Sequence, residues 1–458
     1  QARRAGQKEV FCKKAVKPHR IVVADIPDHL HLPAGGGALV RPVLVAVILQ
    51  PEALEGLLPQ VQKALELIEQ DQDRCIAEQC ELVQIEAPTG HEEKRAAVFA
   101  DKLRALGLED VHIDRGGNVV ALRRGKGKGP RVLIEGHLDT VFPFGSVKGV
   151  EQRDGFIYAP GIGDDTRALA MLLSLARAMN EAGIETAGDV VFVGTTREEG
   201  TGSLGGMKDF LQDNPDIDIS LSIDNNDMSG IVYQATIGET WEVTFSGTGG
   251  HAFGAFGTIA QPIHAAARAV AKIADIQVPA EPKTTYCVSF HGGNDAGVHA
   301  IASEAVVKLN FRSNSPEEFE VMKKKIFDAF EQAAREETDR WGKNTIEWSK
   351  KLIGSVPGGS QDEHAPLVEA AWLSLEHVGV EPVLAKGGCT NANVAMARGI
   401  PALCMGRAYA PDAESKTIYN HSLDERYPVA GAYKAVQQAL LVLLMAAGVD
   451  GVFGSIVK

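Results

Sequence analysis

The chain has 458 residues, of which 45% are hydrophobic and 23% charged; this composition is ordinary for a globular protein, and the length favours two domains over one. The formal net charge of -14 argues against nucleic acid and anionic membranes as partners, because both need basic patches. The longest apolar run near the start, Pro42–Leu49, is far shorter than the roughly 18 residues that a membrane helix requires.

Residues 1–60 differ in composition from the rest and are expected to form a poorly ordered N-terminal extension. They are basic at first, then broken by Pro18, Pro27, Pro33 and Pro42 and by the run Gly35–Gly37. From about Leu57 the apolar residues recur with helical spacing, and a second helix is expected after Pro88. Short apolar strands follow, the last of them Arg131–Glu135, so the pattern predicts an α/β domain with a largely parallel sheet.

The first chemical motif is GHLDTV, which follows that strand directly. It presents His137 and Asp139 two residues apart, where an imidazole and a carboxylate lie side by side at the end of a strand. Alone, such a pair is more often a satisfied polar contact than a metal site. The sequence that follows favours the metal site.

Three further acidic groups come where predicted elements begin or end. Asp164 and Asp165 lie in GIGDDTRA at the start of a predicted helix, where capping is the simpler interpretation of an isolated pair. Glu198 and Glu199 follow an apolar strand in TTREEGTGS, and Asp224 follows the strand Ile219–Ile223. The carboxyl ends of parallel strands meet at one edge of a sheet, so these groups are expected to converge there with His137.

The chain from 237 to 350 reads strand, helix, strand, strand, helix, strand, which is the order of a ferredoxin-like domain. It predicts a domain inserted into the first one, whose two parts are then 61–236 and 351–458. The second part contains the loop Gly387–Asn393, the strand Ala402–Met405, the stretch NHSLDERYP with His421, and a final helix.

Together these residues make a donor set of two histidines and three carboxylates, listed as His137, Asp164, Glu199, Asp224 and His421. Such a set suits Zn²⁺, with Mn²⁺ or Co²⁺ as alternatives. With one bridging carboxylate, five side chains can hold two metals that share a water of lowered pKa. Glu198 can then take a proton from that water and pass it to a leaving amine.

These motifs resemble, in order and spacing, the family of two-metal exopeptidases and deacylases that includes peptidase T, glutamate carboxypeptidase, aminoacylase and succinyl-diaminopimelate desuccinylase. The resemblance covers about residues 62–447. It implies a three-layer α/β catalytic domain like that of zinc exopeptidases, with an inserted ferredoxin-like lid and dimerisation domain. It assigns His137 and Asp224 to one metal, Glu199 and His421 to the other, and Asp164 to both.

The resemblance also implies roles for residues around the metals. Asp139 would orient His137, and Glu198 would be the general base and acid. His251, in a Gly-Gly-His loop, would reach across a dimer to stabilise the oxyanion. Arg312 would clamp a substrate carboxylate, and Gly388 would let the substrate approach the backbone of its loop. Relatives often have a cis peptide at the position of Asp164–Asp165.

Three departures from the family pattern bear on the substrate. Thr166–Ala168 stand where relatives commonly have Lys and Gly, and His299 stands where Asn is frequent. At position 224 this chain has Asp, where other members of the family have Glu. Within the family, Asp at this position accompanies di- and tripeptidases. The sequence therefore predicts a small-peptide exopeptidase, with an N-acyl amino acid deacylase or carboxypeptidase, or a catalytically silent metal- or peptide-binding relative, as alternatives.

The expected partners are a small peptide or N-acyl amino acid and a second copy of the chain. Six cysteines without CxxC spacing favour free thiols in a reducing compartment. We therefore expect a cytoplasmic protein, with a secreted or periplasmic location left open.

Overall fold

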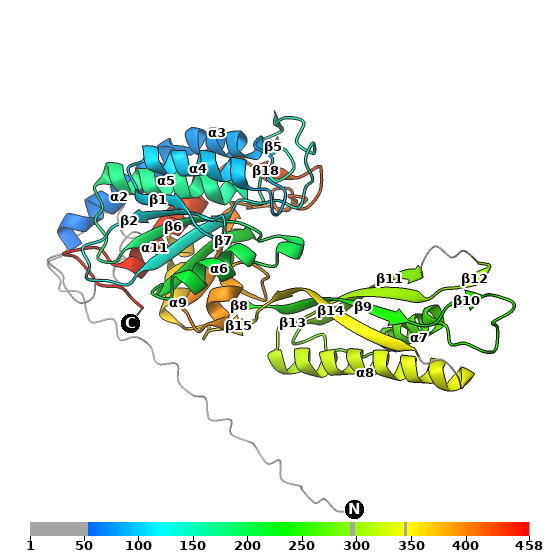
Figure 1. Ribbon diagram of the computed structural model, residues 1–458. Helices are drawn as coiled ribbons and strands as arrows, with labels where there is room; N and C mark the ends of the chain where they lie inside the picture. Colours follow the sequence, from blue (N-terminus) through cyan, green and yellow to red (C-terminus); the bar gives the residue numbers. More distant parts are fainter. Residues whose placement is uncertain (1–53, 294–297, 343–345, 458) are drawn as a thin grey trace, which may run out of the picture.

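The computed structural model describes residues 54–293, 298–342 and 346–457, and nine strands of this part form one mixed sheet in the larger of two lobes (Figure 1). The strands follow one another in the order β1-β2-β6-β3-β7-β17-β8-β15, and β16 pairs with β8. Their bounds are β1 (Glu109–Ile113), β2 (Val119–Arg123), β3 (Val132–His137), β6 (Val190–Thr195), β7 (Ile219–Asp227), β8 (Gly230–Ala235), β15 (Gly359–Ser360), β16 (Val383–Lys386) and β17 (Ala402–Ala408).

The four central strands, β6, β3, β7 and β17, run parallel to one another. Every residue of β3, β6 and β17 is buried, which is typical of parallel strands covered on both faces. On either side of this core the sheet is mostly antiparallel, through the β2–β6 pairing on one side and the β17–β8 pairing on the other. The sequence predicted the parallel core and missed the antiparallel edges.

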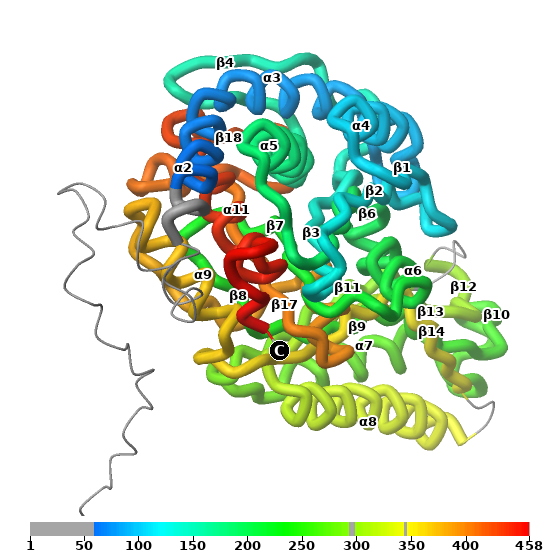
Figure 2. Tube along the Cα trace, turned by 90° about the vertical axis from the view of Figure 1, so that its left-hand side faces the viewer, coloured from blue at the N-terminus to red at the C-terminus, as the bar shows by residue number. Residues whose placement is uncertain are grey.

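Helices cover both faces of the sheet, so the lobe has three layers (Figure 2). On one face, apolar residues of six helices pack in one core with β3 and β7: α2 (Leu54–Gln70), α3 (Gln72–Val83), α4 (Glu93–Ala105), α5 (Thr166–Ala182), α9 (Pro366–His377) and α11 (Tyr433–Ala447). The other face packs against α6 (Gly205–Asp213) and α10 (Ala392–Ala397). Helix α5 is buried along nearly its whole length and ends at Gly183, whose left-handed φ of 67° suits a residue without a side chain.

The second lobe projects from the first and contains the predicted βαββαβ order (Figure 1). Its described elements are β9 (Ile237–Ser246), α7 (Pro262–Ala274), β11 (Thr284–Gly293), β13 (Glu304–Ser313), α8 (Pro316–Trp341) and β14 (Glu347–Val356). The strands form an antiparallel sheet in the order β11-β13-β9-β14, and both helices share a core with it. Both helices begin with proline, which is preorganised for a first helical position.

Small elements complete the described fold. A three-stranded sheet joins β4 (Glu151–Arg153), β5 (Phe156–Tyr158) and β18 (Arg426–Pro428), and it brings the late segment around residue 425 beside the loop that precedes α5. Strands β10 (Gly250–His251) and β12 (Ala300–Ile301) pair at the far end of the second lobe, and the short helix η2 spans Gly200–Gly202. None of the helices in the described ranges combines the length and hydropathy of a membrane span.

The structure corrects several expected boundaries. Strand β7 continues through Asp224 to Asp227, and β17 continues three residues beyond Met405 to Ala408. Strand β14 runs to Val356, past the expected domain boundary at 350. Most of the expected extension 1–60 lies outside the described residues, and helix α2 already begins at Leu54. The division into 61–236, 237–350 and 351–458 as functional domains stays a prediction.

Candidate metal centre

The predicted donor residues meet at the carboxyl edge of the parallel core. His137 ends β3, Asp164 lies two residues before the start of α5, and Asp224 lies in β7. Glu199 lies in the loop after β6, and His421 in the loop before β18. Neighbouring parallel strands end on the same side, so the topology brings together residues that are up to 284 positions apart in sequence.

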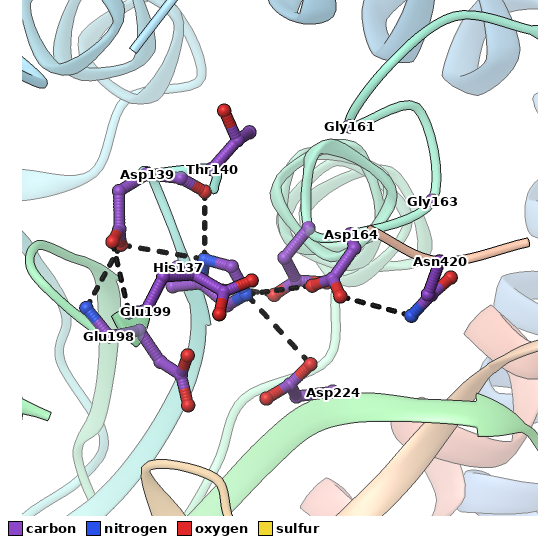
Figure 3. Close-up of polar contacts among 12 residues, drawn as sticks. His137, Asp139, Thr140, Gly161, Gly163, Asp164, Glu198, Glu199, Asp224 and Asn420 are labelled. Carbon is purple, nitrogen blue, oxygen red and sulfur yellow. Dashed lines mark hydrogen bonds and ion pairs between the residues drawn. The ribbon is translucent and has the colours of Figure 1, made fainter. Parts of the chain in front are cut away.

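One donor group consists of His137, Asp164 and Asp224. His137 Nε2 lies 2.9 Å from Oδ1 of Asp164 and 3.9 Å from Oδ1 of Asp224. The three side chains point toward one another in Figure 3. His137 is only 1% exposed, so its ring is held in a site largely closed to bulk solvent.

A second donor group consists of Asp164, Glu199 and His421. His421 Nε2 lies 2.9 Å from Oε1 of Glu199 and 3.2 Å from Oδ2 of Asp164. Asp164 therefore contacts a histidine on each side, one through each carboxylate oxygen. This is the arrangement that a bridging carboxylate requires.

The carboxylate of Asp139 contacts the loop that contains Glu198 and Glu199, called the glutamate loop below, more closely than it contacts the imidazole ring of His137. Its two carboxylate oxygens accept hydrogen bonds from the backbone N–H groups of Glu198 and Glu199, both at 3.0 Å (Figure 3). Thr89 Oγ1 also donates to this carboxylate, at 2.8 Å. Nδ1 of His137 lies 2.9 Å from the backbone oxygen of Asp139 and 3.5 Å from its carboxylate. One residue thus fixes both the ring and the two glutamates.

Burial and mutual repulsion perturb the acidic groups. Burial, followed by the charge of Asp224, raises the pKa of Glu198 well above its usual range. Burial, followed by Asp164, raises the pKa of Asp224 to about 7. For Asp164 burial opposes ionisation, but the neighbouring Arg407 and His137 hold its pKa well below the usual range. Glu198 is therefore a buried carboxyl group that binds a proton readily, as a general base requires.

The chemistry of this donor set fits divalent cations. Four carboxyl groups, those of Asp164, Glu198, Glu199 and Asp224, are gathered in a largely buried site, and such like charges repel unless cations are present. The donors are imidazole nitrogens and carboxylate oxygens, which suit Zn²⁺ and Mn²⁺. His137, Asp164 and Asp224 would hold one ion, and Asp164, Glu199 and His421 the other.

Comparison with known proteins decides the family. The model of peptidase family M20/M25/M40 matches residues 133–445, which is more than half of the chain and includes all the donor residues. The chain belongs to this family. The predicted resemblance is thereby confirmed, as are the α/β fold class and the class of metallopeptidase or amidohydrolase.

Three relatives illustrate the range of the M20 family. A succinyl-diaminopimelate desuccinylase from Corynebacterium glutamicum is 28% identical over 359 residues, which cover 76% of this chain and 90% of the relative. The structure of a tripeptidase from Staphylococcus aureus matches with a TM-score of 0.67 and 26% identity, covering 81% of this chain and 97% of that one. A dinuclear metal binding peptidase of the M20 family from Bacillus subtilis shares the fold, with a TM-score of 0.60, 16% identity and coverage of 83% and 99%.

A cleft beside the donor groups lies between the two lobes of this M20 protein. It is lined by Glu198, Glu199 and His421 from the first lobe and by Asn310 and Arg312 from the second. The guanidinium of Arg312 is exposed, and its Nε donates to Oδ1 of Asn310 at 2.9 Å. The structure thus brings the predicted carboxylate clamp to the same cleft as the predicted base.

Two residues that the sequence predicted to be functional, His251 and Gly388, are not among the residues that line this cleft. His251 is exposed on β10 at the far end of the second lobe, away from the donor groups of its own chain, and its Nδ1 accepts from the backbone N–H of Gly254 at 3.1 Å. At Gly388 an added Cβ would lie 2.7 Å from Cγ1 of Val232, so close packing against β8 requires glycine there. Cys389, the next residue, lines the cleft.

The expected cis peptide bond between Asp164 and Asp165 is present. Oδ2 of Asp165 accepts from the backbone N–H of His137 at 2.9 Å. The second aspartate of the pair therefore fastens the end of β3 to the start of α5, while the first belongs to both donor groups.

Sequence reasoning missed two buried charged residues of the site. The carboxylate of Glu425 accepts hydrogen bonds from the backbone N–H groups of Gly161, Gly163 and Asp164 at 2.8 to 2.9 Å. Burial, followed by Asp164, raises the pKa of Glu425 to about 7. Arg407 on β17 contacts three of the aspartates. The signal in the sequence was the glycine-rich stretch GIGDD, whose backbone N–H groups need an acceptor such as the carboxylate of Glu425.

Proposed function

We propose that this M20 protein is a two-metal exopeptidase that hydrolyses the amide bond of a small peptide. The observation that carries this proposal is the position of Asp164, which contacts His137 through one oxygen and His421 through the other. A carboxylate so placed suits the bridge between two cations. When bound, two Zn²⁺ ions, or Mn²⁺ or Co²⁺ in their place, would supply Lewis-acid chemistry and a water of lowered pKa.

The residues of the chain carry the proton and hold the substrate. Glu198 would accept the proton of the attacking water at its carboxylate and deliver it to the leaving amine nitrogen. Its raised pKa supports this role, because a base that gains a proton must also retain it until the amine leaves. Asp139 would keep the base in place through the backbone N–H of Glu198.

Arg312 would bind the free carboxylate at the C-terminal end of the substrate, because a guanidinium pairs with a carboxylate through two parallel hydrogen bonds. Its place in the same cleft as Glu198 supports a substrate short enough to span the two. The likeness to a tripeptidase structure and the Asp at position 224 favour a short peptide. The desuccinylase relative favours the second candidate, an N-acyl amino acid, whose carboxylate Arg312 would hold in the same way.

A substrate panel tests the proposal. The metal-loaded protein is assayed with free di- and tripeptides, with the same peptides amidated at the C-terminus, and with N-acyl and N-succinyl amino acids, each with Zn²⁺, Mn²⁺ and Co²⁺. Glu198→Gln should lower kcat by roughly 100-fold to 10,000-fold while metal content stays at the wild-type level. The matched control is Glu93→Gln, at an exposed position on α4.

Each outcome of the panel has a clear meaning. Faster turnover of free tripeptides than of acyl amino acids supports the peptidase, and the reverse order supports the deacylase. Full activity of Glu198→Gln would refute the mechanism. Metal uptake without turnover of any substrate would show a silent binding relative instead.

We also propose that residues 237–350 serve as a lid and dimerisation domain. The exposure of His251 at the far end of this lobe supports a role outside the cleft of its own chain, as in a site completed by a second copy. Light scattering should then give a homodimer. In mixtures with a catalytically dead Glu198→Gln chain, His251→Ala should recover part of its lost activity, because each heterodimer would hold one cleft with an intact base and an intact histidine.

A further inference from the structure

Arg407 places a fixed positive charge against one of the two donor groups that share Asp164. Its side chain is 1% exposed and lies at the carboxyl end of β17, next to β7. Nη1 lies 2.5 Å from Oδ1 of Asp224, and Nη2 donates to Oδ1 of Asn226 at 2.7 Å. Longer contacts reach Asp164 at 3.4 Å and Asp165 at 3.5 Å.

The guanidinium faces the site, unlike those of Arg95 and Arg167, which are also almost fully buried. Arg95 donates to the backbone oxygens of Ile85 and Leu138, and Arg167 donates to the backbone oxygen of Ala432. The guanidinium groups of these two arginines therefore satisfy backbone carbonyl groups. Arg407 instead contacts the carboxylate oxygen of Asp224 that lies nearest to His137 Nε2, at 3.9 Å.

The contacts of Arg407 are unequal between the two donor groups. Asp224 belongs only to the group with His137, and it makes the shortest contact with the guanidinium. In the other group, Glu199 is paired with His421, and Arg407 reaches that group through the shared Asp164. A cation held by His137 and Asp224 would therefore share the Asp224 carboxylate with the positive charge of Arg407.

We propose that Arg407 makes the two metal positions unequal, so that a divalent cation binds more weakly between His137 and Asp224 than between Glu199 and His421. This inference rests on the proposed two-metal function. Two effects act in the same direction: like charges repel strongly in a poorly solvated site, and the guanidinium competes for an oxygen of Asp224. Arginine stays protonated at every working pH, so the inequality is permanent.

Metal titration of the full-length apoprotein tests the proposal without any activity assay. Zn²⁺ binding is followed by isothermal calorimetry in competition with a chelator of known affinity. The wild type should show two steps of different affinity, of which Asp224→Asn removes the weaker and Glu199→Gln the tighter. Arg407→Met and Arg407→Gln should tighten the weaker step by roughly tenfold or more, because they remove the competing charge.

Two further variants separate charge from structure. Arg407→Lys keeps the charge and should leave the second step weak. Arg167→Met removes a buried arginine that contacts Cys75 and Ala432 and should leave both steps unchanged.

The proposal is overturned if the wild type binds both ions equally, or if the weaker step depends on Glu199. It is also overturned if the uncharged variants fail to tighten that step, because Arg407 would then serve only to position Asp224. These results leave the two-metal function intact. If the wild type binds no divalent ion at all, the proposed function itself fails.

Discussion

The substitution Asp139→Asn tests whether one buried carboxylate organises both halves of the catalytic apparatus. Asp139 is fully buried, and its two oxygens accept the backbone N–H groups of Glu198 and Glu199 separately. An asparagine has one acceptor oxygen and one amide group, so at least one of these N–H groups would face another donor. Leaving one buried donor unpaired costs about 1–3 kcal/mol, and losing the charge of the acceptor adds about 1 kcal/mol.

The expected destabilisation is therefore about 2–4 kcal/mol, which lowers Tm by about 2–4 °C in a protein of this size. The glutamate loop and the His137 ring would also shift, so kcat/KM should fall by roughly 10-fold to 100-fold. Thermal unfolding and peptide hydrolysis are measured on Zn²⁺-loaded protein. Asp101→Asn, on the exposed part of α4, is the control and should change neither. If Asp139→Asn matched the wild type in both measurements, the organising role would be refuted.

The remaining predictions concern the cleft and its neighbours. Arg312→Ala should lower kcat/KM for free peptides at a cost of about 1.5–3 kcal/mol in transition-state binding and leave C-terminally amidated peptides unaffected; equal losses would contradict the clamp. Gly388→Ala should lower the free energy of unfolding by about 1–3 kcal/mol through crowding against β8, whereas Gly454→Ala, with open space around it, should be neutral in the same chemical denaturation experiment. Burial raises the pKa of the Cys389 thiol, so iodoacetamide at neutral pH should modify exposed Cys287 first and Cys389 only as the pH rises, which peptide mass mapping will detect; the reverse order would contradict the burial.

The sequence predicted the parts of the fold that depend on local periodicity. Helix α7 (Pro262–Ala274) is the first of the two helices expected between residues 237 and 350, because proline at its first position and its apolar spacing both mark a helix. The strand before His137 was also recognised, because its apolar run is continuous. The convergence of Asp164, Glu199 and Asp224 followed from one topological rule about parallel strands.

The missed features depend on contacts that local sequence does not encode. Arg407 was overlooked because the apolar run of β17 ends at Met405, and an arginine after such a run usually faces solvent. In the structure β17 continues because β7 beside it also continues past Asp224, and the pairing carries Arg407 inward. Glu425 was overlooked because its partners lie more than 260 residues earlier in the chain.

The most direct test of the two-metal centre is anomalous X-ray diffraction from crystals of the protein grown with Zn²⁺. We predict two anomalous peaks at the carboxyl edge of the sheet, one beside His137 and Asp224 and the other beside Glu199 and His421, with Asp164 touching both. Peaks at other residues, or none at this edge, would contradict the proposed site.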